Sequence, residues 1–351
     1  MAGRLALGVL SLGLAAAVWA MYGPGPLAPV AWTPPPGRHH PPTGGLAGIE
    51  RVELPDGHGP EDLAVDAQGR IVTGLHDGRV MRWSDPKAQP ETLFDTGGRP
   101  LGLAFDRQGR LVIADATRGI LRWPEGGPLQ TLTETCGGTP LTLADDLEIG
   151  PDGTIWFSDA SSRWRLPAWK MDFVESRPSG RLCAWVPTTG QSLEILSGLH
   201  FANGVAVDPE GRFVLVVESS RYRVRRLWLS GPRVGEDDVL IGDLPGVPDG
   251  ISTGMDGTFW LAIASPRDPT LDALAGWPSV RRIFGQLPLV LQPDPARSAR
   301  FMGVDAEGAV VADRVDPEGT GIWAVTNVRE ADGWLYLGSL LDTAWARVPR
   351  P

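Results

Sequence analysis

Four oxygen-bearing side chains occupy the same position in a phrase that the sequence repeats. Each stands eight residues before the glycine of an expected turn, and the four are Glu61, Asp145, Asn203 and Asp249. Two further copies of the phrase have Leu101 and Val325 there. Carboxylate and amide oxygens suit a hard cation, calcium before magnesium, and the absence of His and Cys from the set disfavours zinc. The set predicts one calcium ion, provided that the fold brings these positions together.

Turn formation is the alternative explanation for each of the four residues. Asp and Asn often begin strands by capping the preceding turn, so any one of them alone is better explained in this way. The whole set is harder to explain as turns, because three carboxylates buried near one axis would destabilise the fold without a compensating cation.

The repeated phrase is a short apolar strand, a turn ending in glycine, and a second strand rich in β-branched and aromatic residues. Clear copies span 63–69, 103–109, 147–153, 205–211 and 251–257, and a weaker copy spans 325–333. Further strand pairs lie between the copies, so each unit is expected to be a four-stranded blade. The sequence therefore predicts an all-β, six-bladed β-propeller, in which the starts of the innermost strands surround the channel mouth. Pairing of 345–348 with 49–53 is expected to close the ring, and the fifth unit holds an insertion near 271–291 with partly helical spacing.

Loops between the second and third strands of each blade are expected on the same rim. They present His76, Asp115, Asp159, Glu218 and Ser339. We expect Asp159 to act as general base or to orient the attacking group, and His76 to shuttle protons. Both residues also suit a simpler role: Asp159 can close its own turn, and His76 precedes a solvated Asp-Gly turn. His200 is expected to pack near the rim.

The composition excludes some classes of function. The 42 acidic and 32 basic side chains give a formal charge of −10, which argues against a phosphate-binding nucleic-acid surface. The two cysteines, Cys136 and Cys183, are too few for a disulfide framework or a zinc site. They lie in unrelated sequence contexts, and we expect both to be structural.

The N-terminus differs in kind from the rest of the chain. Residues 5–22 contain no charge, and a proline-rich stretch follows. We interpret 1–23 as a signal anchor, with a cleaved signal peptide as the alternative. Residues 24–44 are then a Pro/Gly-rich linker and 45–351 the propeller, membrane-anchored on the non-cytoplasmic side, or secreted if the segment is cleaved.

Several of these phrases resemble the strictosidine synthase-like family over about residues 45–350. They are Gly59-Pro-Glu-Asp-Leu63, Gly98-Arg-Pro-Leu-Gly102, Trp156-Phe-Ser-Asp-Ala-Ser-Ser-Arg-Trp164, Phe201-Ala-Asn-Gly-Val205 and Pro245-Gly-Val-Pro-Asp249. More distantly, the ring is similar to that of the gluconolactonase and paraoxonase enzymes. The resemblance implies metal ligands at Glu61, Asn203 and Asp249. Asp145 departs from the pattern, since relatives commonly have asparagine there.

The resemblance implies a calcium-dependent hydrolase of esters or lactones, with a small-molecule substrate. The alternative is a non-catalytic membrane-anchored propeller that serves as a binding or scaffolding module, with calcium only bracing the channel. The amine–aldehyde condensation of the family's namesake is not expected. That reaction uses a glutamate in the sixth blade, and the matching region, 325–328, has no carboxylate.

Overall fold

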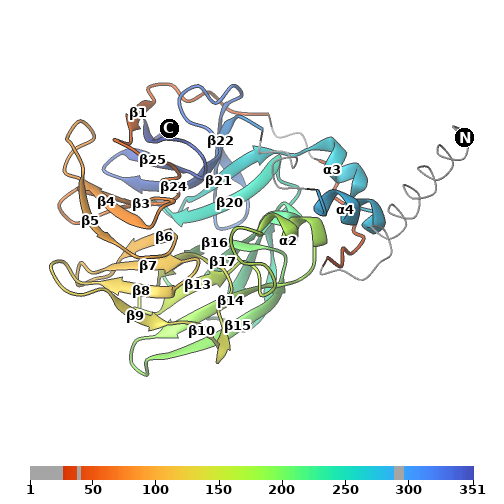
Figure 1. The fold of residues 1–351 in the computed structure, drawn as a ribbon, viewed down its shortest axis with the longest axis horizontal. Coiled ribbons are helices and arrows are strands. Elements are labelled where there is room, and N and C mark those ends of the chain that lie inside the picture. Colours follow the sequence, from red (N-terminus) through yellow and green to blue (C-terminus); the bar gives the residue numbers. More distant parts are fainter. Residues whose placement is uncertain (1–26, 38–40, 288–295) are drawn as a thin grey trace, which may run out of the picture.

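The computed structural model describes residues 27–37, 41–287 and 296–351. Within them the chain forms six four-stranded antiparallel sheets, arranged as blades around a central axis (Figure 1). The predicted all-β, six-bladed propeller is therefore confirmed.

The first three blades take their strands in chain order from the axis outward. Blade 1 contains β2 (Leu63–Val65), β3 (Ile71–Gly74), β4 (Arg79–Trp83) and β5 (Glu91–Asp95). Blade 2 contains β6 (Pro100–Phe105), β7 (Leu111–Asp115), β8 (Gly119–Trp123) and β9 (Gln130–Thr133). Blade 3 contains β12 (Ala144–Ile149), β13 (Ile155–Asp159), β14 (Gly180–Val186) and β15 (Gln191–Leu199).

The last three blades complete the ring. Blade 4 contains β16 (Ala202–Val207), β17 (Phe213–Glu218), β18 (Arg223–Trp228) and β19 (Asp237–Ile241). Blade 5 contains β20 (Gly246–Thr253), β21 (Phe259–Pro266), β22 (Ala299–Val304) and β23 (Val310–Asp316). Blade 6 contains β24 (Val325–Ala331), β25 (Trp334–Ser339), β26 (Ala344–Pro349) and β1 (Glu50–Glu53). The pairing of Val52 with Trp345 confirms the predicted closure.

The hairpins that were recognised in the sequence form for a simple reason. In blade 1 the Asp66 carboxylate accepts hydrogen bonds from the backbone N–H groups of Gln68 and Arg70, and Gly69 adopts a positive φ of 76°. Asp106, Asp208 and Asp305 make the same bonds in other blades. An aspartate that accepts from its own turn, followed by a glycine, fixes the two strands in register.

A bulge recurs near the start of the innermost strands. In β12 the register passes from Ala144–Asp159 directly to Leu147–Phe157, so the inner strand has one extra residue. The same shift occurs in β16, β20 and β24. The blade 6 hairpin is shorter, with Ala331 paired to Trp334, so counting back from its glycine misses by one. Thr326, and not Val325, therefore occupies the equivalent position, and Val325 is buried in the core.

Helices lie together on one rim of the propeller, on the right in Figure 1. α2 (Lys170–Glu175) lies between β13 and β14, and η1 (Ser219–Arg221) lies between β17 and β18. The blade 5 insertion forms α3 (Pro269–Leu274) and α4 (Pro278–Gly285), as the sequence predicted. All of these loops connect a second strand to a third, so they share the rim at which the innermost strands begin.

The proline-rich stretch is bound to these helices over residues 27–37, which we call the strap. The N–H of Val30 donates to the carbonyl of Glu175, and the N–H of Trp32 donates to the carbonyl of Ala275. Arg281 donates to the carbonyl of Val30 as well. This part of the expected linker is thus an integral part of the rim.

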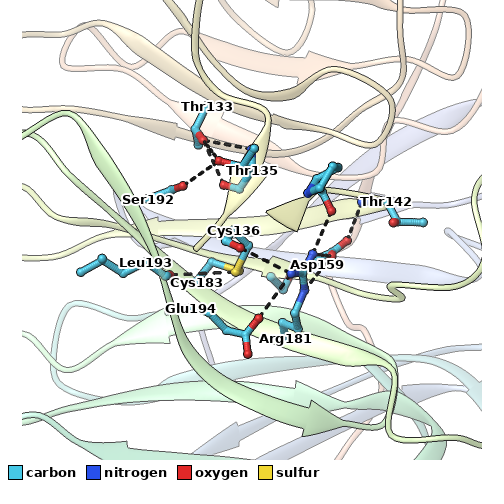
Figure 2. Close-up of a disulfide and its surroundings, with 12 residues drawn as sticks. Thr133, Thr135, Cys136, Thr142, Asp159, Arg181, Cys183, Ser192, Leu193 and Glu194 are labelled. Atoms are coloured by element: carbon cyan, nitrogen blue, oxygen red, sulfur yellow. Dashed lines mark hydrogen bonds and ion pairs between the residues drawn. A yellow bond between two sulfur atoms is a disulfide. The ribbon is translucent and has the colours of Figure 1, made fainter. Parts of the chain in front are cut away.

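The two cysteines form a disulfide, which corrects the expectation that their contexts are unrelated (Figure 2). Cys136 lies in the small hairpin of β10 (Thr135–Cys136) and β11 (Thr139–Pro140), between blades 2 and 3. Cys183 lies in β14, and the Cα atoms are 5.7 Å apart. The sequence could not show this because 47 residues separate them, and only the folding of the hairpin over blade 3 brings them together. Their predicted structural role fits this bond.

The predicted anchor, 1–23, lies outside the described residues. Among the residues that are described, no helix is long and apolar enough to cross a membrane.

Candidate metal centre

Asp145, Asn203 and Asp249 lie in the bulges of β12, β16 and β20, and Glu61 lies just before β2 at the same end of the channel. We call this set the mouth ring (Glu61, Asp145, Asn203, Asp249). The repulsion among its carboxylates shows their proximity. Burial raises the pKa of Asp145 well above its usual value, and the charges of Glu61 and Asp249 raise it further. The pKa of Asp249 is also raised, first by burial and then by Glu61, while the amide of Asn203 hydrogen-bonds to its carboxylate.

Glycine permits this convergence of strands. Gly204 follows Asn203 in the bulge, and a Cβ atom there would lie 2.3 Å from the backbone nitrogen of Ile251 in the next blade. A Cβ on Gly250, after Asp249, would lie 2.5 Å from the carbonyl oxygen of Thr326. Any larger residue at these positions would force the inner strands apart.

One arginine partly neutralises the mouth ring. The guanidinium of Arg99 forms an ion pair with Glu61 and donates to the carbonyl of Gly59 at 2.9 Å. Burial raises the pKa of Glu61, and Arg99 lowers it in opposition. Asp145 receives no hydrogen bond from any described residue. The mouth ring therefore has three carboxyl groups and one arginine.

The donor set fits calcium in its chemistry, since it consists of three carboxylates and one amide. The side chains as they stand are more widely spaced than a bound ion requires. Within the described ranges no three His, Cys, Asp or Glu side chains are grouped closely enough to hold a metal ion.

A second charged layer, which the sequence analysis missed, lies next to the ring in the same inner strands. We call it the channel cluster (Asp62, Asp146, Glu148, Arg329). Arg329 contacts Glu148 at 2.9 Å and Asp62 at 3.8 Å, so it connects blades 6, 3 and 1. Burial raises the pKa of Asp62 to about 6, against the lowering effect of Arg329. The acidic doublets Glu61-Asp62 and Asp145-Asp146 were the available signal.

Carboxylates of the channel cluster also join neighbouring blades directly. Asp62 accepts from the N–H of Leu103 at 2.7 Å, and Asp146 accepts from the N–H of Val205 at 2.9 Å. Each of these bonds satisfies a buried backbone donor within the next inner strand. The cluster therefore holds in place the strands that carry the mouth ring.

Asp159, which was predicted as the base, does not join the mouth ring. Its side chain is fully buried at the end of β13, and one oxygen accepts from the N–H groups of Thr142 and Leu143. The other oxygen forms an ion pair with Arg181 (Figure 2). Glu218 has an equivalent place in blade 4, where it accepts from the N–H of His200. These two acids hold in place the backbone that leads into β12 and β16.

His76 lies exposed on the rim and stacks on His58, with ring centroids 4.5 Å apart. Partial burial of its ring lowers the pKa of His76, as do the charges of Arg99 and His58. His76 is therefore near the arginine that pairs with the mouth ring, and it is neutral at pH 7. His200 packs in the rim as expected, and burial lowers its pKa to about 4.

An apolar wall borders the ring along blades 2 to 4. Leu101, the blade 2 counterpart of the ligands, packs in a cluster with Phe201, which lies two residues before Asn203. Phe201 contacts Phe173 of α2 at a centroid distance of 4.6 Å. The mouth thus combines a polar floor with an apolar side, an arrangement that suits an uncharged organic ligand.

Two parts of the chain match families of known proteins. Residues 145–232 match the family described as strictosidine synthase, and residues 39–83 match the N-terminal family described as strictosidine synthase-like.

The chain is also similar to individual curated proteins. It is 35% identical over 315 residues to protein strictosidine synthase-like 3 of Arabidopsis thaliana, which covers 81% of this chain and 80% of that protein. It is 35% identical over 202 residues to the adipocyte plasma membrane-associated protein of Rattus norvegicus. In that case the match covers 55% of this chain and 54% of the relative.

Solved structures share the fold at low identity. A gluconolactonase from Xanthomonas campestris superposes with a TM-score of 0.64 at 19% identity, covering 93% of this chain and 98% of that one. Regucalcin from Agrobacterium tumefaciens, described as a calcium-binding protein, superposes with a TM-score of 0.60 at 15% identity, covering 87% and 95%. At these identities the similarity establishes the propeller fold.

Proposed function

The chain belongs to the strictosidine synthase-like family, and from this membership and the geometry of the channel mouth we propose that it is a calcium-dependent hydrolase of esters or lactones. The observation that supports this most is the mouth ring, in which one buried and two half-buried carboxylates repel one another and face one arginine. A cation would relieve this repulsion. The names gluconolactonase and regucalcin among proteins of the same fold agree with the proposal.

Glu61, Asp145, Asn203 and Asp249 would hold the ion. When bound, calcium would polarise a carbonyl oxygen and favour the oxyanion of an acyl-transfer reaction. The apolar wall of Leu101 and the α2 aromatic side chains would bind the carbon skeleton of the substrate and exclude water from one side.

Proton transfer requires a group of suitable pKa near the mouth. Asp159 is unsuited to it, since both its oxygens already accept hydrogen bonds or an ion pair. His76 is exposed, neutral at pH 7 and within the electrostatic influence of Arg99. It can accept a proton from water.

The test is a substrate screen on the full chain. Aryl esters and lactones are offered to protein stripped with chelator, and then to the same protein after addition of calcium or magnesium. The proposal expects hydrolysis that disappears with chelator and returns with calcium. Hydrolysis that is equal in both states, or no higher than with heat-denatured protein, would contradict it.

A second candidate is the non-catalytic membrane-anchored propeller. The observation in its favour is the Glu61–Arg99 ion pair, which already satisfies one expected ligand without a metal. This candidate predicts a calcium effect on melting temperature with no turnover, so the same screen separates the two.

For location, we propose an anchor at 1–23 with the propeller on the non-cytoplasmic side. The disulfide supports this side, because disulfides persist in oxidising compartments. The adipocyte relative is named as plasma membrane-associated. Full-length protein should resist carbonate extraction from membranes; a soluble mature protein beginning near Met21 would instead indicate a signal peptide.

A further inference from the structure

An apolar and basic surface covers the helical rim. We call this part of the molecule the cap, and define it as the strap, residues 161–179 with α2, and residues 267–287 with α3 and α4. Nine large apolar side chains are exposed in the described residues, and four of them lie in the cap. They are Val30 at 40% exposure, Leu271 at 54%, Trp277 at 64% and Phe284 at 48%.

The charge of the cap is opposite to that of the molecule. Its helical segments contain seven basic and four acidic residues in a chain of net charge −10. The basic residues are Arg163, Arg165, Lys170, Arg177, Arg267, Arg281 and Arg282. Aromatic and aliphatic side chains beside arginines are typical of a surface that lies in the headgroup region of an anionic bilayer.

The cap is a built structure, held by contacts among its parts. Arg281 is buried and donates to the carbonyls of Val30 and Phe173, joining α4 to the strap and to α2. The hydroxyl of Tyr222 donates to Asp272 of α3 at 3.0 Å. The exposed apolar side chains are therefore presented by a rigid platform.

The strap also sets the distance from the platform to the uncharged N-terminal run. Leu27 is buried, and five residue steps separate it from Tyr22, the last residue of that run. An extended chain of five residues spans at most about 18 Å. An anchor at 1–23 would thus keep the cap within this distance of the bilayer.

We propose that the cap docks on an anionic membrane surface through Leu271, Trp277, Phe284 and Val30, with the solvent-accessible basic residues Arg165, Lys170 and Arg282 toward the headgroups. The channel mouth, which shares this rim, then faces the bilayer. The distance of the cap from the bilayer depends on the proposed anchor, whereas the exposure of its apolar and basic side chains is independent of it.

Labelled single cysteines test this directly, because both native cysteines are bonded to each other. The full chain is prepared as Phe284→Cys or as the control Met255→Cys, labelled with an environment-sensitive dye and mixed with anionic vesicles containing a doxyl lipid quencher. Met255 is a suitable control because it is 79% exposed and lies at the opposite end of β21. The proposal expects roughly twofold or greater quenching at position 284 and none at 255.

Three results would overturn the docking proposal. The first is equal quenching at both positions, and the second is quenching at neither. The third is disulfide cross-linking between unlabelled Phe284→Cys chains, which would show that the cap binds a second copy of the chain. The anchor is tested separately by flotation of the unlabelled full chain with neutral vesicles, to which the anchor alone should bind. A chain that floats without quenching at 284 refutes docking and leaves the anchor standing.

A charge variant adds an independent readout. In the double variant Arg165→Gln/Arg282→Gln, each charge removed should weaken membrane binding about fivefold. Half-maximal quenching at position 284 should therefore require a higher fraction of anionic lipid. The control Arg233→Gln, in the β18–β19 loop on the opposite rim, should leave it unchanged. An identical lipid dependence for both variants would contradict the assignment of the basic residues to the membrane face.

Discussion

Arg99 and calcium would compete for Glu61, and this residue pair makes the first prediction. Arg99→Gln removes a buried charge next to the mouth ring and leaves Glu61 without its ion-pair partner. We expect the calcium-free protein to lose about 3 kcal/mol of unfolding free energy, and calcium affinity to rise at least about tenfold. Calorimetric titration and melting with chelator measure the two effects.

The matched control is Arg82→Gln, since Arg82 pairs with Glu91 of β5 and with Glu125 of the β8–β9 loop, both of which are exposed. It should leave calcium affinity unchanged. A fall in calcium affinity in Arg99→Gln would mean that Glu61 is not a ligand.

A second prediction at this scale concerns the sixth blade. Thr326 occupies the position that the ligands have in other blades, and its hydroxyl donates to the carbonyl of Glu61 at 2.7 Å. Glu330, the nearest acid in β24, is buried and bonded to Trp260 and Arg350. Because the sixth blade has no carboxylate at this position, no condensation of tryptamine with an aldehyde is expected. Enzyme-dependent product by mass spectrometry would refute this.

The inner strands are held by the channel cluster, and their stability should depend on Arg329. Its side chain is 16% exposed and pairs with Glu148, itself 15% exposed. Arg329→Met leaves Asp62 and Asp146 without a cation, so urea unfolding should show a loss of about 3–5 kcal/mol. Adding Glu148→Gln should recover part of the loss, because it removes one of the repelling charges.

The control is Arg79→Met, whose partners Asp56 and Asp77 are both about half exposed or more. Exposed pairs contribute about 1 kcal/mol or less. Equal losses in the two arginine variants would show that the channel cluster is not a buried network.

The cap contains a carboxylate whose titration should be visible in stability. Burial raises the pKa of Asp172 to about 6, although Ser161 and Ser179 donate to it and Arg163 lies nearby. A carboxyl with a raised folded-state pKa binds its proton more tightly when folded, so stability falls as pH rises from about 4 to 6. The two-unit difference corresponds to about 3 kcal/mol.

Asp172→Asn should remove this contribution. We expect the melting temperature of the variant, relative to wild type, to be higher at pH 7 than at pH 4.5. Thermal melts across this pH range measure the effect, and the same difference at both pH values would contradict a raised pKa for Asp172.

At the scale of the molecule, the repeat made the architecture predictable. The Asp and Gly of each hairpin act locally, so blade number and ring closure followed from sequence. Features that depend on long-range packing did not follow: the Cys136–Cys183 bond, the strap on α4, and the ion pairs of Arg329. The error at Val325 came from a shortened hairpin, which only the register reveals.

The candidate site was predicted in the same uneven way. Equivalent positions in a propeller converge, so the mouth ring could be inferred from four residue types at one spacing. The ends of second strands also recur, but their side chains turn into the blade, as Asp159 does. The local sequence around Asp159 does not indicate whether its side chain points into the blade or into the channel.

The central claim is that the propeller uses its mouth ring for calcium-dependent hydrolysis, and Asp249→Asn tests it most directly. This change keeps size and one oxygen but removes a charge, so calcium should bind more weakly. Turnover and melting temperature are measured together for variant and wild type over a range of calcium concentrations. Our account predicts that saturating calcium restores the melting temperature while the rate stays about tenfold or more below wild type, a loss of about 1.4 kcal/mol. Full recovery of the rate with the melting temperature, or a wild type that binds calcium without hydrolysing any ester or lactone, would contradict it.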